Sequence, residues 1–547
     1  MSLPDLPPLY YLTNFHLVHQ WVWQHSADLL QAEQQALSQR FVTLTTDAQA
    51  LLLRLLMRKG LWFRVSKLHY AEIACSPTAL RELQQAGLLD QPTVMAAEPY
   101  AHLHTMAELR QRFSPLAHHA RKAEFTQALC QAYPQGVSSV TSVVYLQPEA
   151  RAWAERLLLL FFGNGHQDWT EFVLSDLGLY RYEQVAFSIG SRAFRHHADV
   201  QCYELLYRWR TQIAQATEQD RATLLPAAVQ AVLALETDSD WLSERKAKTL
   251  YVLGQWAEKK ATNLDLAEQA YAASRWPMAS LRRARVLELQ GHYQQAWEQG
   301  QHIMVDSQHE AVLQKWARIA LRLHKKLALR DAPLPCSTGF EPSRVDLSLP
   351  PDPLGARIEQ QVCDYYDHPQ APVFYVENTL IQALFALWCW DALYAPVAGA
   401  FFHPYQRGPA DLYSPTFYQR RQGWFEQAWE SLNDDSYKHL IETRWHSKHG
   451  LQCGWVQWQA LSLDLLRMAL QCISAADLRV IFQRLLDDLR ENRSGLPDLI
   501  RFWPLEKRYE WIEVKGPGDR LQDNQLRWLR FFADHGMQAS VCHVRWC

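Results

Sequence analysis

The stretch Gly495-Leu-Pro-Asp-Leu-Ile-Arg-Phe-Trp503, followed by Tyr509-Glu-Trp-Ile-Glu-Val-Lys515, decides the fold of the C-terminal part of this chain. Both segments are rich in apolar residues, the second in aromatic and β-branched ones, and the residues between them are typical of a turn. Alternate side chains share one face of a strand, so Glu513 and Lys515 are expected to point the same way. The pattern therefore predicts a β-hairpin with Asp498 across from these two side chains.

Two acids and a lysine at this spacing can hold a hard divalent cation through oxygen ligands and keep a water molecule beside it. The triplet Glu-x-Lys is weak evidence alone, because it recurs at residues 244–246 and 258–260 in helical patterns, where side chains two apart diverge. Only the third copy follows a Pro-Asp at hairpin distance. From the residues alone two alternatives remain, a metal site and a solvated salt bridge on an edge strand.

The same segment resembles a known nuclease module. Gly-x-Pro-Asp at 495–498, Glu-Val-Lys-Gly-Pro-Gly-Asp-Arg-Leu at 513–521, and then Gln525 are similar to the virus-type replication-repair nuclease (VRR-NUC) module of the PD-(D/E)xK superfamily. The close match covers about residues 495–546. Together with the upstream chain, it resembles the Fanconi-associated nuclease family in its shorter, bacterial-type form.

The resemblance implies a restriction-endonuclease-like core and a bound Mg²⁺ or Mn²⁺. The implied ligands are Glu377, Asp498, Glu513 and the backbone carbonyl of Val514. Lys515 would orient the attacking water or neutralise developing charge, and Gln525 would bond the lysine or the scissile phosphate unless it is simply exposed. The implied enzyme cuts DNA near 5′ flaps, trims it 5′→3′, and works in DNA repair that includes interstrand crosslinks.

Glu377 has a second interpretation. It precedes the apolar positions Leu380, Ile381, Leu384 and Trp388, which follow at helical spacing. An acid in the first turn of a helix is favourable electrostatically, so it can be a purely structural residue. An unpaired carboxylate buried on an apolar face is costly, however, and a metal would remove that cost.

Composition limits the other possibilities. The chain has 547 residues, 48% of them hydrophobic and 21% charged, with a net charge of −3, so it has room for several domains and is not globally basic. DNA binding would therefore need local positive patches. The start of the sequence lacks a secretory pattern, and we expect a soluble, intracellular protein of the bacterial cytoplasm or nucleoid. The apolar segment 383–402 has transmembrane length but carries Asp391, which favours a buried helix and no membrane.

The N-terminal half is predicted to be helical. Residues 1–84 form a DNA-contacting helical domain, with a basic group that can grip phosphates or serve only as a solvated face. This group is Arg54, Arg58, Lys59, Arg64 and Lys67. Residues 85–149 resemble a SAP-like helix pair, with helices over 106–113 and 122–132 and a capping box from Thr105 to Glu108.

Residues 150–330 are predicted to be a tetratricopeptide-type (TPR-like) helical array. The segments 264–271 and 290–297 repeat loosely, with Ala267 and Ala296 where paired helices approach. Such an array spaces DNA-contacting ends or binds a protein partner. Residues 331–356 are so rich in proline that a connector is expected, which leaves 357–547 as the nuclease domain.

The overall prediction is a multidomain, mainly α protein with a C-terminal α/β nuclease domain that acts on branched or flapped double-stranded DNA. Arg407, Arg420 and Arg421 are further candidates for phosphate contact, with structural salt bridges as the equal alternative. Two other functions stay open: a Holliday-junction-type resolving nuclease on the same core, and a non-catalytic helical scaffold. The intact Asp498, Glu513 and Lys515 argue against the scaffold.

Overall fold

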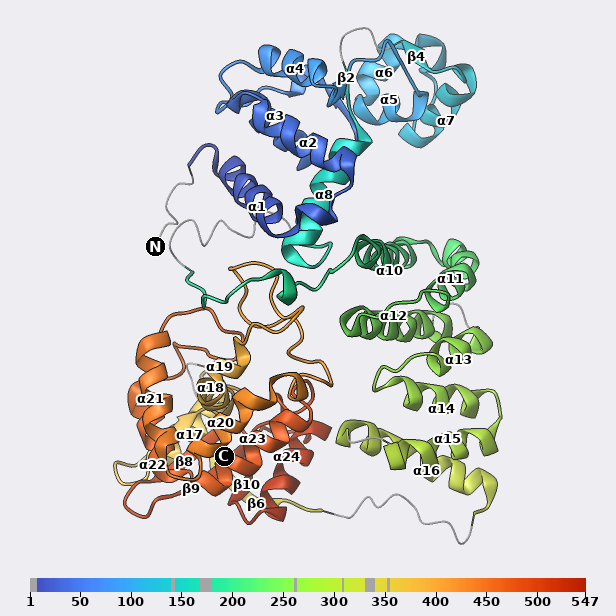
Figure 1. Ribbon diagram of the computed structural model, residues 1–547. Coiled ribbons are helices and arrows are strands. Elements are labelled where there is room, and N and C mark those ends of the chain that lie inside the picture. Colours follow the sequence, from blue (N-terminus) through green and yellow to red (C-terminus); the bar gives the residue numbers. More distant parts are fainter. Residues whose placement is uncertain are drawn as a thin grey trace. The chain divides into compact units, whose positions relative to one another are not determined.

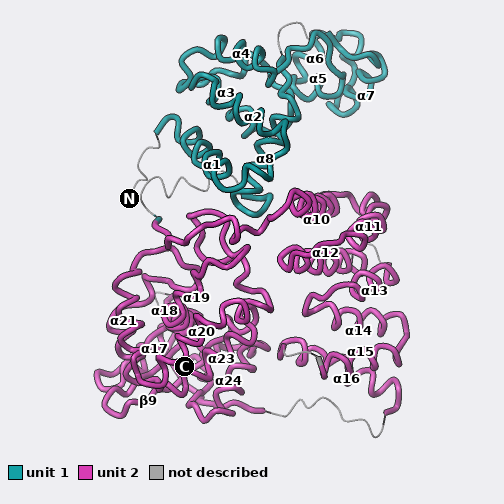
Figure 2. The backbone as a smooth tube through the Cα atoms, viewed as in Figure 1, with its two compact units in different colours: residues 1–180 teal, residues 181–547 magenta. Residues whose placement is uncertain are grey.

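The computed structural model describes residues 7–138, 143–167, 180–259, 263–306, 309–329, 340–351 and 355–547 (Figure 1). It divides into two compact units, residues 1–180 and 181–547, which are coloured separately in Figure 2. Each unit has its own buried core.

Unit 1 begins with a helical layer around buried aromatic residues. Its helices are α1 (Tyr10–Ser26), α2 (Ala32–Thr43), α3 (Thr46–Leu56), α4 (Ser76–Gln85) and α8 (Pro148–Phe162). Phe15, Phe41 and Trp153 are in mutual ring contact in this core. The predicted helical stretch is interrupted by strand β1 (Trp62–Arg64), which pairs antiparallel with β5 (Val143–Leu146), while β2 (Leu89–Asp90) pairs with the other edge of β5.

The second part of unit 1 contains the two helices expected there. They are α6 (Met106–Arg112) and α7 (Lys122–Ala132), accompanied by α5 (Ala97–Leu103) and a small ribbon of β3 (Val94–Met95) and β4 (Val137–Ser138). The predicted capping box is confirmed: the Glu108 N–H donates to Thr105 Oγ1, and the Thr105 N–H donates to the Glu108 carboxylate. The SAP-like character of this pair stays a prediction.

Unit 2 opens with helices that stack in chain order in Figure 1. They are α10 (His197–Gln215), α11 (Glu218–Leu233), α12 (Asp240–Lys259), α13 (Leu264–Ala272), α14 (Ala279–Leu289), α15 (Tyr293–Asp306) and α16 (Glu310–Leu327). Ala267 and Ala296 are fully buried, as expected where helices approach closely. The array comprises α10 to α16, because α8, most of which lies in the predicted range 150–330, packs on α1 and α2 in unit 1. The assignment of the array to the tetratricopeptide type stays a prediction.

The C-terminal part of unit 2 is built on a five-stranded sheet in the order β6-β10-β9-β8-β7. The strands are β6 (Ser343–Leu349), β7 (Val373–Tyr375), β8 (Leu499–Trp503), β9 (Arg508–Lys515) and β10 (Ala539–Trp546). The predicted hairpin is confirmed, since β8 and β9 pair antiparallel with Leu499 opposite Ile512. Helix α24 (Asp523–Asp534) leads from β9 to β10, which runs parallel to both β9 and β6.

Helices packed on this sheet or on one another complete the core. They are α17 (Ile358–Tyr366), α18 (Leu380–Trp388), α19 (Trp390–Leu393), α20 (Gln422–Ser431), α21 (Ser436–Lys448), α22 (Leu463–Cys472) and α23 (Ala475–Asp487). Every residue of α18 is buried, and Trp388 and Phe482 stack at a centroid distance of 4.8 Å. Among the described residues, none of the helices combines the length and apolar character needed to cross a membrane.

The predicted connector is corrected by strand β6. Residues 331–339 and 352–354 lie outside the described residues, but 343–349 form an edge strand that pairs in parallel with β10. Pro342 and Pro350 flank this strand instead of interrupting it, and prolines at the ends of an edge strand cost no hydrogen bond of the ladder. The nuclease sheet therefore begins before residue 357.

Candidate active site

The hairpin brings three of the predicted site residues together. Lys515 Nζ lies 2.8 Å from Glu513 Oε1, as expected for residues two apart on β9. Asp498 immediately precedes β8, and its Oδ2 accepts a hydrogen bond of 2.8 Å from the backbone N–H of Val514. Asp498 and Lys515 are 8% exposed and Glu513 is fully buried, so the charged groups face one another away from bulk water.

Burial changes the acidity of both carboxyl groups. Loss of solvent raises the pKa of Glu513 to about 8, and the charge of Asp498 adds to this, although Lys515 acts in the opposite direction. Loss of solvent also raises the pKa of Asp498 to about 6, with Val514 N–H donation opposing and the charge of Glu377 adding. A second positive charge at this place would therefore be needed to hold both groups ionised near neutral pH.

Glu377 lies in the turn before α18 and not in its first turn, because the helix begins at Leu380. Its side chain is exposed and paired: Tyr375 Oη donates to Glu377 Oε2 at 2.5 Å, and Asn378 donates to Oε1 at 3.2 Å. The expectation that this carboxylate would be buried and unpaired was wrong. The charge of Glu377 nevertheless raises the pKa of both Asp498 and Glu513, so it acts on the same site.

Tyr375 was not found from the sequence. It ends strand β7, opposite Leu499, and the next residue, Val376, donates its N–H to the carbonyl of Asp498 at 2.8 Å. This pairing positions the Tyr375 phenol beside the Glu377 carboxylate, to which it donates a hydrogen bond. The only sequence signal for this role was its position two residues before Glu377.

Gln525 joins the site from the first turn of α24. Its Nε2 donates to Glu513 Oε1 at 2.6 Å, and its Oε1 accepts from the backbone N–H of Gln522 at 2.9 Å. The expected partners were the lysine or a phosphate. In the structure Gln525 instead donates to the Glu513 carboxylate, which Lys515 also contacts.

The buried carboxylates fit a divalent cation. Glu513 Oε2 is buried and has no hydrogen-bond partner. A bound cation would supply the missing partner of this oxygen. The described residues contain no group of three or more His, Cys, Asp or Glu side chains arranged to hold a metal by themselves. Mg²⁺ commonly binds through one or two carboxylates and keeps several waters, so the pair Asp498 and Glu513 suits such an ion.

The basic group of unit 1 is partly engaged in ion pairs. Arg54 pairs with Glu72 and stacks on Tyr11, and Arg64 makes a bidentate pair with Glu108 at 2.8 and 2.9 Å. The remaining members are exposed. They are Arg58, Lys59 and Lys67.

Two of the other candidate arginines form ion pairs with the same acid. Arg420 and Arg421 both pair with the buried Asp411, at 2.8 and 2.7 Å, and Arg421 is fully buried. These two make structural salt bridges, the alternative that the sequence had left open, and a fully buried Arg421 has no access to a phosphate. Arg407 is exposed.

Comparison with known protein families finds two matching domains. Residues 432–546 match the VRR-NUC domain, and residues 9–90 match the FAN1 HTH domain, close to the helical domain predicted over 1–84. The C-terminal domain is thus a nuclease domain of the VRR-NUC class.

The full chain has relatives of the same organisation. It is 41% identical to the Fanconi-associated nuclease 1 homolog of Pseudomonas aeruginosa, covering all of this chain and 98% of that protein. It is 25% identical to the Arabidopsis thaliana homolog, covering 68% of it. A crystal structure of paFAN1 bound to DNA with a two-nucleotide 5′ flap and a gap superposes with a TM-score of 0.87 at 40% identity, over 100% of both chains. The chain belongs to the Fanconi-associated nuclease family.

Proposed function

We propose that this protein is a divalent-cation-dependent DNA nuclease that cuts near 5′ flaps, also trims DNA 5′→3′, and acts in DNA repair, including that of interstrand crosslinks. The observation that carries the proposal is the buried cluster of Asp498, Glu513 and Lys515 on one hairpin. The similar paFAN1 chain, which was crystallised with 5′-flap DNA, supports flapped DNA as the substrate. Crosslink repair is supported by the family name, and 5′→3′ trimming is what the family resemblance implies.

The proposed cation site uses the two buried carboxylates, with the Val514 carbonyl as a further ligand. Glu377 would join them only by leaving its partners Tyr375 and Asn378. Mg²⁺ or Mn²⁺ bound there would polarise a phosphate oxygen and lower the pKa of a bound water. The chain's own groups arrange the rest: the Val514 N–H fixes Asp498, and Gln525 fixes Glu513. These hydrogen bonds hold the acidic oxygens in place before the substrate arrives, which reduces the reorganisation needed during reaction.

Lys515 is proposed to act on the reacting phosphate. Its ammonium group is held 2.8 Å from Glu513 and is almost buried, so its charge is little screened by water. In this role it would orient the attacking water by hydrogen bonding and stabilise negative charge that develops on the phosphoryl oxygens.

Side-chain variants test these roles. Lys515→Ala and Asp498→Ala should each abolish cleavage of a labelled 5′-flap substrate while DNA affinity, measured by fluorescence anisotropy, stays near that of the wild type. Lys325→Ala, at an exposed position of α16, is the matched control and should cleave normally. Undiminished cleavage by either active-site variant would reject the assignments.

A further inference from the structure

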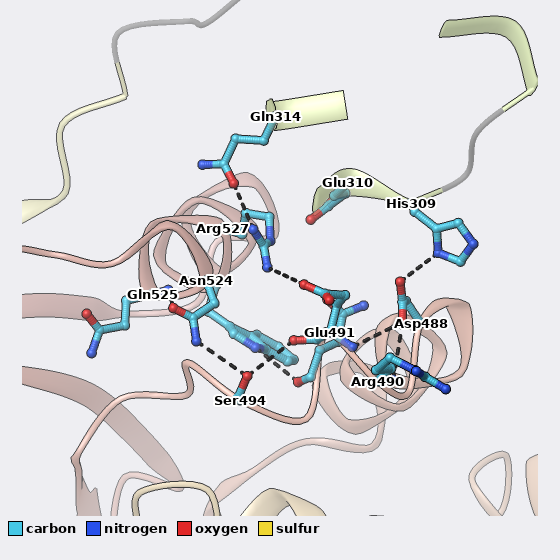
Figure 3. Close-up of polar contacts among 12 residues, drawn as sticks. His309, Glu310, Gln314, Asp488, Arg490, Glu491, Ser494, Asn524, Gln525 and Arg527 are labelled. Atoms are coloured by element: carbon cyan, nitrogen blue, oxygen red, sulfur yellow. Dashed lines mark hydrogen bonds and ion pairs between the residues drawn. The ribbon is translucent and has the colours of Figure 1, made fainter. Parts of the chain in front are cut away.

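The last helix of the array is bonded to the nuclease domain within unit 2. At its start, His309 Nδ1 lies 2.6 Å from Asp488 Oδ2 (Figure 3), and the Glu310 carboxylate accepts two hydrogen bonds from Arg484, at 2.9 and 2.6 Å. The Arg484 side chain is 7% exposed and its guanidinium packs over Trp528 of α24 at 4.8 Å. Helix α16 thus contacts the surroundings of α24 as well as its own array.

Two further contacts reach α24 on either side of Gln525. Arg318 pairs with Asp523 at 2.5 Å, and Gln314 Oε1 accepts a hydrogen bond from Arg527 Nη1 at 2.7 Å. Figure 3 shows Arg527 between Gln314 and Glu491, while Gln525 projects away from α16. The two residues that flank Gln525 at a distance of two positions are therefore both bonded to α16.

These two contacts differ in how strongly they constrain α24. In the pair of Arg318 and Asp523 the side chains are 57% and 34% exposed, and such surface pairs contribute little to stability. Arg527 is only 10% exposed, and besides Gln314 it lies 3.5 Å from Glu491. Removing a hydrogen-bond acceptor from a buried guanidinium is costly. The bond that Arg527 donates to Gln314 therefore constrains α24 more strongly than the pair of Arg318 and Asp523 does.

We propose that Gln314 is a positioning residue for the nuclease site, acting from the helical array. By holding Arg527 it fixes the first turns of α24, and it thereby keeps Gln525 within hydrogen-bond distance of Glu513. This inference rests on the proposed function. It gives the array a part in the chemistry as well as in spacing, because a displacement of the array's last helix would be transmitted through Arg527 to the carboxylate.

The first experiment compares two glutamines that make the same kind of bond. Gln314→Ala removes the acceptor of Arg527, whereas Gln299→Ala removes a Gln–Arg bond inside the array, where Gln299 Oε1 accepts from Arg283 at 3.0 Å. Gln314→Ala should lower kcat on flap DNA about tenfold, since small misplacement of reacting groups is costly, with KM unchanged. Gln314→Glu keeps an acceptor oxygen and should restore most of the rate, and Gln299→Ala should match the wild type.

The second experiment tests the route through Gln525. In a Gln525→Ala background, adding Gln314→Ala should have no further effect on kcat, because residues that act through one another are not additive. Amide hydrogen exchange of the metal-free protein over residues 522–527 should be faster in Gln314→Ala and unchanged in Gln299→Ala. Additive effects, or unchanged exchange, would overturn the inference. An inactive wild type would instead reject the proposed function, while the exchange result would still decide on Gln314.

Discussion

At the scale of single residues, the hairpin acids and the lysine were predictable because strand periodicity alone puts Glu513 and Lys515 on one face. Glu377 was not, since its exposure and its bond to Tyr375 depend on how strand β7 lies against β8. Nor was the partner of Gln525, which comes from a different element. Side chains whose neighbours are far away in sequence are beyond the reach of local patterns.

Burial of Glu513 predicts a pH dependence of stability. Its folded pKa of about 8 lies above the ordinary value of 4.5, so the unfolded chain releases this proton at lower pH than the folded one. The metal-free protein should therefore lose stability as pH rises from about 4.5 to about 8. Glu513→Gln should melt a few degrees higher than the wild type at pH 8 and at nearly the same temperature at pH 5.

The control for this prediction is Glu506→Gln, an exposed acid in the turn of the same hairpin, which should leave the melting curve unchanged at both pH values. Melting profiles of Glu513→Gln and wild type that run parallel from pH 5 to 8 would contradict the burial argument.

At the scale of elements, the hairpin, β10 and most helices of the nuclease domain follow from local pattern, whereas β6 does not. Its pairing with β10 joins residues nearly 200 positions apart, for example Asp346 and His543, and its flanking prolines suggested a connector. In the array, Ala267 and Ala296 indicated close approach correctly. Gly300 was missed, although it also lies where two helices approach closely.

Gly300 predicts the effect of one added methyl group. A Cβ at this position of α15 would lie 1.7 Å from the Trp316 ring, which is fully buried and cannot move aside. Gly300→Ala should therefore destabilise unit 2 by about 3 kcal/mol, as overpacking does. Gly423→Ala, in helix α20 with open space around it, should be neutral or stabilise by about 0.5–1 kcal/mol. Equal chemical-denaturation midpoints for the two variants would refute this.

At the scale of the whole molecule, a net charge of −3 means that DNA affinity must come from local patches, and the part of unit 1 matched by the FAN1 HTH domain holds the densest basic group of the N-terminal half. The sequence identified this group but not its division into paired and exposed members. That division arises because Glu72 and Glu108, distant in sequence from Arg54 and Arg64, fold against them.

The exposed members predict a salt-dependent loss of binding. Changing Arg58, Lys59 and Lys67 together to alanine should weaken flap binding and reduce the slope of log affinity against log salt by about 0.9 for each phosphate that the protein no longer neutralises. The same change to Arg420, already bonded to Asp411, should leave that slope unaltered. Anisotropy titrations between low and moderate salt measure both slopes, and an unchanged slope in the triple variant would exclude this patch as a phosphate-binding surface.

We propose that this protein cuts flapped DNA with the help of a divalent metal ion. The most direct measurement is the initial cleavage rate of the wild-type chain on a 5′ flap, a four-way junction and a plain duplex, with Mg²⁺, Mn²⁺ or a chelator. We predict cleavage near the flap with either ion, slower cutting of the junction and the duplex, and none with the chelator. Cleavage that survives chelation, or a preference for the four-way junction over the flap, would contradict the account.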